Sequence, residues 1–114
     1  MFAKIKPARA FIFTLAGMNL DTLVYMDRIR AIVQQLPATS EGICYGTPGF
    51  YVKKKLLARL KEDGETLAIY TEERDKWIKA KPAVFYFTDH YRNYPMMLIR
   101  LQKVSQKDLE NLIH

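Results

Sequence analysis

The chain has 114 residues, of which 49% are apolar and 26% are charged. These are the proportions of a soluble protein with one hydrophobic core, and they exclude an intrinsically disordered chain. Eighteen basic and twelve acidic residues leave a formal net charge of +6, which permits binding to a polyanion without requiring it. The longest nearly uncharged apolar run, residues 10–18, is far shorter than the ~20 residues of a membrane-spanning helix.

The first 17 residues carry three cations and no acid, and a short apolar block follows the cations. Three interpretations remain open: a weak secretory signal, an additional strand at 11–13, or a start codon upstream of the native one at Met18. We favour the last interpretation, because Asn19 or Asp21 just after Met18 is a natural helix cap. The predicted organisation is therefore an N-terminal extension, residues 1–17, and one domain, residues 18–114.

Apolar residues recur at three- and four-residue spacing between residues 20 and 36, with polar residues mostly on the other side. This spacing predicts an amphipathic helix over 20–36. Pro37 ends the helix, because proline disfavours helical geometry in the residue before it. Residues 38–42 are expected to form a loop. The apolar positions are Met26, Ile29, Ile32, Val33 and Leu36.

The stretch 41–60, EGICYGTPGFYVKKKLLARL, has the pattern of two hairpins that join three short strands. The strands are expected at 43–45, 50–52 and 55–60, and the turns at 46–49 and 53–54. Alternation along the third strand predicts one apolar side and one mixed side. The apolar side would carry Leu56, Ala58 and Leu60, and the mixed side Lys55, Leu57 and Arg59.

The rest of the chain alternates between polar turns and short apolar runs. Gly64 allows a tight turn at 61–65, Thr71 is expected to cap a short helix that ends before Pro82, and Ser105 is expected to cap the closing helix. Strands are predicted at 66–70, 84–87 and 96–101, with a polar, aromatic loop at 88–95. The predicted fold class is α+β, with an antiparallel meander sheet and helices on one face.

Two segments in this order, LPATSEGICYGTPGFYVKKKLLARL and FYFTDHYRNYPMMLIRL, resemble the MmcQ/YjbR family of small bacterial proteins. The resemblance covers residues 20–114 and leaves residues 1–17 outside. It is carried by the Tyr45-Gly46-Thr47-Pro48 turn, Phe50, Lys55 at the start of a strand, and the segment His90-Tyr91-Arg92.

The resemblance implies a frataxin-like (YjbR/CyaY-like) fold with a double-wing arrangement, for which DNA binding has been proposed from the shape. It implies no cofactor and no catalytic residue. This chain differs from the family where many members build a turn with glycines, since it has Lys53-Lys54 there. Lysine is strained at positive φ, so either the turn type differs or the strain is tolerated. The exchange also adds charge at a wing tip.

Cations and aromatic residues of the second hairpin and of the 88–95 loop are the candidate contacts to nucleic acid. Lysine and arginine bind phosphates, tyrosine can stack on bases, and a β-ribbon can enter a major groove. The alternative is that the lysines only protect a solvated hairpin edge from aggregation and that the tyrosines pack within the loop. The candidates are Lys53, Lys54, Lys55, Arg59, Tyr91, Arg92 and Tyr94.

No pattern in the chain predicts catalysis. Asp89 and His90 are neighbours whose side chains are expected to point apart, and no motif places a nucleophile beside them. Cys44, the only cysteine, lies in an apolar stretch and is expected to be a buried, unreactive thiol. Glu41 is expected to bind backbone amides of the turn at Gly46, and His90 to be structural. We therefore predict that the protein is not an enzyme.

The predicted first helix is a poor candidate for metal binding, because Asp21 and Asp27 are offset there by Arg28 and Arg30. A single cysteine forms no disulfide within the chain, so nothing requires an oxidising compartment, and we expect a cytoplasmic protein without a metal or cofactor. The preferred function is DNA binding. The alternative is a protein-interaction module that uses the open sheet face and has no nucleic-acid role.

Overall fold

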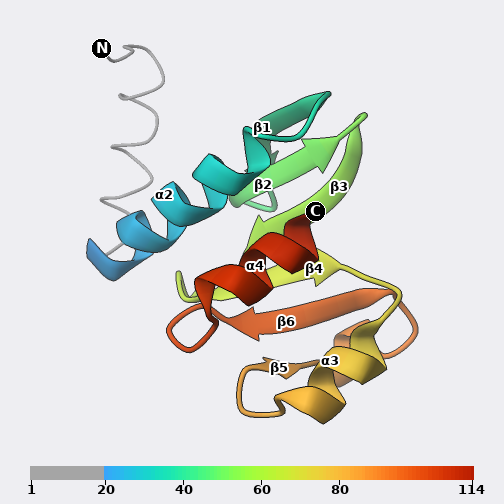
Figure 1. Ribbon diagram of the computed structural model, residues 1–114. Coiled ribbons are helices and arrows are strands. Elements are labelled where there is room, and N and C mark those ends of the chain that lie inside the picture. Colours follow the sequence, from blue (N-terminus) through green and yellow to red (C-terminus); the bar gives the residue numbers. More distant parts are fainter. Residues whose placement is uncertain (1–19) are drawn as a thin grey trace.

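A computed structural model describes residues 20–114 (Figure 1). The predictions for residues 1–17 lie outside the described residues. The elements are α2 (Leu20–Val33), β1 (Thr39–Cys44), β2 (Thr47–Val52), β3 (Lys55–Leu60), β4 (Thr66–Tyr70), α3 (Arg74–Ala80), β5 (Phe85–Tyr86), the 3-10 helix η1 (Asp89–Tyr91), β6 (Met96–Arg100) and α4 (Gln106–Ile113). None of the helices described there is long and apolar enough to cross a membrane.

The six strands form one antiparallel sheet in the order β1-β2-β3-β4-β6-β5. The first four strands follow one another as a meander, as the sequence predicted. After β4 the chain passes through α3 and leaves the place beside β4 empty for β6. β5 therefore forms the edge of the sheet, and β6 lies between β4 and β5 and pairs with both. The α+β prediction is confirmed.

The core lies between one face of the sheet and the helices (Figure 1). Strands bury every second residue there, because successive side chains point to opposite faces, and α2 and α4 add their apolar stripes. Trp77 and Ile78 of α3 pack against the same cluster, so the prediction of helices on one face is confirmed. The largest fully buried side chains include Phe50, Leu60, Leu67, Phe85 and Ile99 from the sheet, with Met26, Ile29 and Leu109 from helices.

The first hairpin turns at Tyr45-Gly46, so the predicted four-residue turn at 46–49 is wrong. Both turn residues have positive φ, 53° and 82°, as a two-residue turn of a twisted hairpin requires. Pro48 lies inside β2, although proline cannot donate to a strand ladder. The Thr47 hydroxyl instead donates to the backbone oxygen of Leu60, which links β2 to β3 where the proline cannot.

The second hairpin turns at Lys53-Lys54, as the sequence predicted. The φ angles are 52° and 70°, so the turn keeps the geometry that usually selects glycine or asparagine. Of the two alternatives, tolerated strain is therefore the correct one. The backbone amide of Lys53 donates to the Ala38 oxygen at 2.9 Å, which extends the β1–β2 pairing to the base of the turn.

A bulge in β3 changes which residues face the core. Tyr51 pairs with Leu56 and Phe50 pairs with Ala58, so Leu57 is the extra residue. At a bulge, two successive side chains point toward nearly the same face of the sheet instead of opposite faces. Leu57 therefore packs against the core, and the prediction that Leu56 shares the apolar side with Ala58 is wrong.

Several element ends also differ from the predictions. The first helix ends at Val33, three residues early, and β1 begins at Thr39 inside the predicted loop. The cap prediction for Thr71 is wrong, because its hydroxyl accepts from the Glu73 amide at 3.1 Å and α3 starts only after Glu73. The predicted strand at 84–87 has two residues. Ser105 caps α4 as predicted, accepting from the Asp108 amide at 3.1 Å.

The strained turn predicts a stabilising double substitution. Lys53→Asn with Lys54→Gly supplies the residue pair that a turn with two positive φ angles favours. We expect the free energy of unfolding in urea to rise by ~1–2 kcal/mol, because each of the two lysines in the left-handed region costs about 1 kcal/mol relative to a residue suited to it. The control is Lys55→Gln, which removes a neighbouring charge from extended backbone. An unchanged or lower midpoint for the double variant would contradict the strain.

Candidate nucleic-acid interface

The tip of the β2–β3 hairpin presents three consecutive lysines, Lys53, Lys54 and Lys55, all exposed. Among residues 20–114, no carboxylate pairs with any of them. The turn projects from the upper corner of the sheet (Figure 1). The tip therefore concentrates three unneutralised charges on one short ribbon.

Strand register brings the lysine tip and the 88–95 loop to the same end of the sheet. β3 begins at Lys55, β4 ends at Tyr70, and Tyr70 pairs with Met96 at the start of β6. The loop that precedes Met96 is therefore two strands away from the lysine hairpin, and because β3 runs on past the level of Tyr70 before it reaches the lysines, the loop and the tip are farther apart than the ~10 Å of two strand spacings. Three exposed carboxylates follow β4 at this end, Glu72, Glu73 and Asp75.

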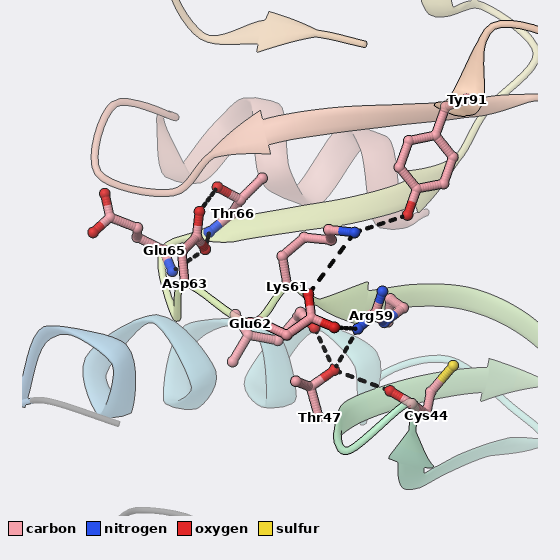
Figure 2. A network of polar contacts seen from close by, with 10 residues as sticks. Cys44, Thr47, Arg59, Lys61, Glu62, Asp63, Glu65, Thr66 and Tyr91 are labelled. Carbon is pink, nitrogen blue, oxygen red and sulfur yellow. Dashed lines mark hydrogen bonds and ion pairs between the residues drawn. The ribbon is translucent and has the colours of Figure 1, made fainter. Parts of the chain in front are cut away.

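Arg59 is not a surface cation. Its side chain is 7% exposed, and its Nη2 donates to Glu62 at 2.9 Å and to the Thr47 hydroxyl at 3.2 Å (Figure 2). Burial is the largest single influence on the pKa of Arg59 and lowers it, but the hydrogen bonds and charges of Glu62 and Tyr91 together outweigh burial, so the net shift is upward. The guanidinium stays charged and its charge is offset within the protein.

The three loop candidates have different surroundings. The Lys61 ammonium donates to the Tyr91 hydroxyl at 3.2 Å (Figure 2), so Tyr91 packs back along the sheet. Arg92 donates to Asp89 at 2.6 Å in an exposed ion pair. Tyr94 is 58% exposed. Only Tyr94 among these is open to solvent without a charged partner.

Arg74 holds the loop, and sequence reasoning missed it. Its Nη1 donates to three backbone oxygens, those of Tyr91 at 2.7 Å, Tyr94 at 2.9 Å and Met96 at 3.1 Å. Its Nη2 donates to the oxygen of Arg92 at 3.0 Å. A loop without a strand ladder has carbonyls that need donors, and that need was the available signal for such an arginine.

A shallow groove of about 620 Å³ runs between residues 71–76 and residues 92–95. Its lining includes Glu72, Glu73 and Asp75 as well as Arg74 and Arg92. Because acidic and basic side chains are mixed along the groove, its electrostatic potential is not uniformly positive, as binding of a polyanion would require. The groove does not extend the lysine tip.

Glu41 does not reach the turn at Gly46. Its two carboxylate oxygens accept from Arg30 Nε at 2.9 Å and from Arg30 Nη2 at 2.8 Å, so that prediction is wrong. The bidentate geometry raises the pKa of Arg30 and connects β1 to α2. The role of Glu41 is to hold the first helix against the edge strand.

Cys44 is half-buried rather than fully buried, because it lies on the edge strand β1. A hydrogen bond with Cys44 raises the pKa of the Tyr51 hydroxyl on the neighbouring strand. His90 contacts the rings of Tyr91 and Tyr94, and Asp89 binds Arg92 instead of orienting that imidazole. In the part of the chain that the structure describes, no three histidine, cysteine or acidic side chains gather closely enough to hold a metal ion.

Comparison of the chain with protein families, with curated proteins and with solved structures finds no match. The geometry above is therefore the basis for any statement about function.

Arg74→Lys tests how the loop is held. Lysine keeps the charge but lacks the planar fork that serves four carbonyls, so we expect the free energy of unfolding to fall by ~2 kcal/mol. Chemical denaturation measures the loss. Arg92→Lys is the matched control, because its exposed ion pair contributes at most ~1 kcal/mol. Equal effects of the two substitutions would contradict the role of Arg74.

Glu62 predicts a pH-dependent contribution to stability. Its bond to Arg59 lowers its pKa below the ordinary 4.5, so the stabilisation is full above 4.5 and is lost as the pH falls through the lower folded value. Wild type and Glu62→Gln should differ at pH 7 and converge in acid, with a small difference because Glu62 is 64% exposed. Thermal melts of both proteins from pH 7 to about 3 measure this, and a constant difference contradicts it.

Proposed function

We propose that this protein is a non-enzymatic, cytoplasmic DNA-binding protein of the MmcQ/YjbR type and that the β2–β3 hairpin is its main contact. The hairpin would act as one wing of a double-wing fold. Binding would be electrostatic, through phosphates, with Lys53, Lys54 and Lys55 as the principal contacts.

The observation that carries this proposal is the pair of lysines held in the left-handed region. Each costs about 1 kcal/mol relative to a residue suited to that conformation, and neither packs against the core to repay the cost. Strain of this kind is kept where function needs the side chain. Here both strained side chains carry a positive charge to the outermost point of a ribbon.

The surroundings of the tip fit a duplex. A two-stranded β-ribbon is narrow enough for the major groove, and three adjacent ammonium groups at its end can reach phosphates on either side. Arg92 and Tyr94 on the same end of the sheet would make a second, weaker contact. Arg59 and Tyr91 are assigned a structural part in this proposal, because their polar groups are already bound inside the protein.

The family resemblance is supported by where its motif residues lie. The Tyr45-Gly46 pair makes a hairpin turn, Phe50 is buried, and Lys55 opens β3. A fold of this type needs a turn former at the first position, a core residue at the second and the start of a strand at the third. The positions of these residues therefore support the proposed membership in the MmcQ/YjbR family.

A second candidate function is binding of a protein strand. β1 is an edge strand of six residues without lysine or proline, and Ile43 on it is 53% exposed. Unprotected edges of this length pair readily with another strand. This observation favours a protein partner at β1, a different surface from the lysine tip.

Salt titration of duplex binding tests the first proposal. Replacement of Lys53, Lys54 and Lys55 by alanine should weaken binding of a short duplex and reduce the slope of log K against log salt by ~3, since each lost phosphate contact removes about 0.9. Fluorescence anisotropy at several salt concentrations measures both quantities. An unchanged slope would show that other residues carry the binding.

Two controls separate charge from folding. Lys76, Lys103 and Lys107 are exposed lysines on other elements, and their triple alanine variant changes net charge equally but should keep most of the slope. The Lys53→Asn, Lys54→Gly variant should bind more weakly while unfolding at higher urea. Tighter or equal binding by that more stable variant would count against the tip.

A further inference from the structure

The sheet face opposite the helices carries three contacts between a cation and an aromatic ring. Arg59 lies 5.3 Å from the centre of the Tyr45 ring, Lys61 lies 5.3 Å from the centre of the Tyr91 ring, and Arg100 lies 4.0 Å from that of Tyr86. All three distances are within the range of an attractive cation–π contact. The cations come from β3 and β6, far apart in the sequence.

Strand parity puts all three pairs on that one face. Leu60 points into the core, so Arg59 and Lys61 on either side of it point away, and the same reasoning applies to Arg100 beside Ile99. Phe85 is in the core and its neighbour Tyr86 is therefore on the opposite face. We call this surface the open face.

The pairs follow one another across the strands. Lys61 bonds through its amide to Thr66, and Thr66 pairs with Arg100, which sets Lys61 and Arg100 about 10 Å apart at the usual spacing. Arg59 lies two residues before Lys61 on β3. Figure 2 shows the Tyr91 hydroxyl reaching the Lys61 ammonium from the far side of β4. Rings and charges therefore lie near one another over the face between the β1–β2 turn and β5, around Ala68 and Leu98, which are buried at its centre.

Two features of this surface are unexplained by folding alone. Tyr45 is 85% exposed although it sits at a φ of 53°, where tyrosine is strained. The Nε atom of Arg59 is buried and has no hydrogen-bond partner, and a buried polar group left unbonded costs ~1–3 kcal/mol. A strained, exposed ring directly over an incompletely bonded guanidinium indicates a surface kept for a ligand.

The ligand chemistry follows from this arrangement. Flat rings beside positive charges match a chain that alternates flat bases and negative phosphates, which is a single-stranded nucleic acid. A duplex keeps its base faces stacked inside, so it cannot use the rings. An apolar protein surface would leave Arg100 desolvated without a counter-charge among residues 20–114.

We infer that the open face binds a single DNA strand, with bases stacked on Tyr45 and Tyr86 and phosphates on Lys61 and Arg100. This inference rests on the proposed DNA binding at the lysine tip, and it adds a second, strand-separated substrate beside the duplex. Glu62 is 64% exposed and pairs with Lys61 at 3.9 Å as well as with Arg59, so it acts as a built-in competitor of the phosphate at Lys61.

Binding of labelled oligothymidylate of about 12 nucleotides, a length within the range that small β-domains cover, tests the inference at about 50 mM salt. Tyr45→Asn removes the ring while creating an Asn-Gly turn that favours the hairpin, so folding is preserved. Tyr86→Leu and Arg100→Gln remove the second ring and a charge. We expect each variant to lose roughly ten-fold in affinity, and Glu62→Gln to gain affinity.

Lys107→Gln is the matched control for Arg100→Gln, because Lys107 is an exposed cation on α4, the helix that packs on the other face of the sheet, and this variant should bind oligothymidylate as wild type does. A parallel titration with a hairpin duplex should respond to the lysine-tip variant and not to Tyr45→Asn. Duplex binding without oligothymidylate binding overturns the inference and leaves the proposed function standing. Failure of both overturns both.

Two further outcomes decide the ligand. Tighter binding of oligouridylate than of oligothymidylate, with the same loss in Tyr45→Asn, overturns the assignment to DNA in favour of RNA. Unchanged oligothymidylate affinity in Tyr45→Asn and Tyr86→Leu, with a loss only in Arg100→Gln, overturns base stacking and leaves charge attraction alone.

Discussion

One-sided coverage of the sheet is the constraint on which the other features depend. Among residues 20–114, three helices pack on one face of the sheet, so every strand places alternate residues on the face opposite these helices. Polar strand residues on that open face bond largely to one another, although the Nε atom of Arg59 has no partner. Arg59 bonds to Thr47 and Glu62, and Lys61 bonds to Tyr91. The open face consequently combines paired polar groups with two buried apolar residues, Ala68 and Leu98.

The sequence was sufficient for the fold class because its signals are local. Helical spacing over 20–36, the lysine turn, Gly64 and the Ser105 cap each act within a few residues, and each is present in the structure. The errors arise where a distant group decides. Pro48 is accepted inside β2 because the Thr47 hydroxyl serves Leu60 across the sheet, and no local pattern contains that bond.

The candidate site was predicted less well for the same physical reason. Lys53, Lys54 and Lys55 lie at a tip where nothing else can reach them, so sequence neighbours alone determine their exposure. The surroundings of Arg59 and Arg92 depend instead on carboxylates three residues away whose rotamers the fold selects. Arg74 was missed because its partners are carbonyls about twenty residues further along the chain. Every residue has a backbone carbonyl, so residue types do not show which carbonyls need a side-chain donor.

The two strained turns connect the fold to the proposed functions. Hairpin geometry demands positive φ at both, and asparagine or glycine would satisfy that demand with less strain than lysine or tyrosine. The chain instead keeps strained residues at both turns: two lysines at one turn and the exposed Tyr45 at the other. β2 runs between these turns, so its length fixes how far the cationic tip lies from Tyr45. A duplex bound at the tip and a single strand bound at Tyr45 would thus lie at opposite ends of β2.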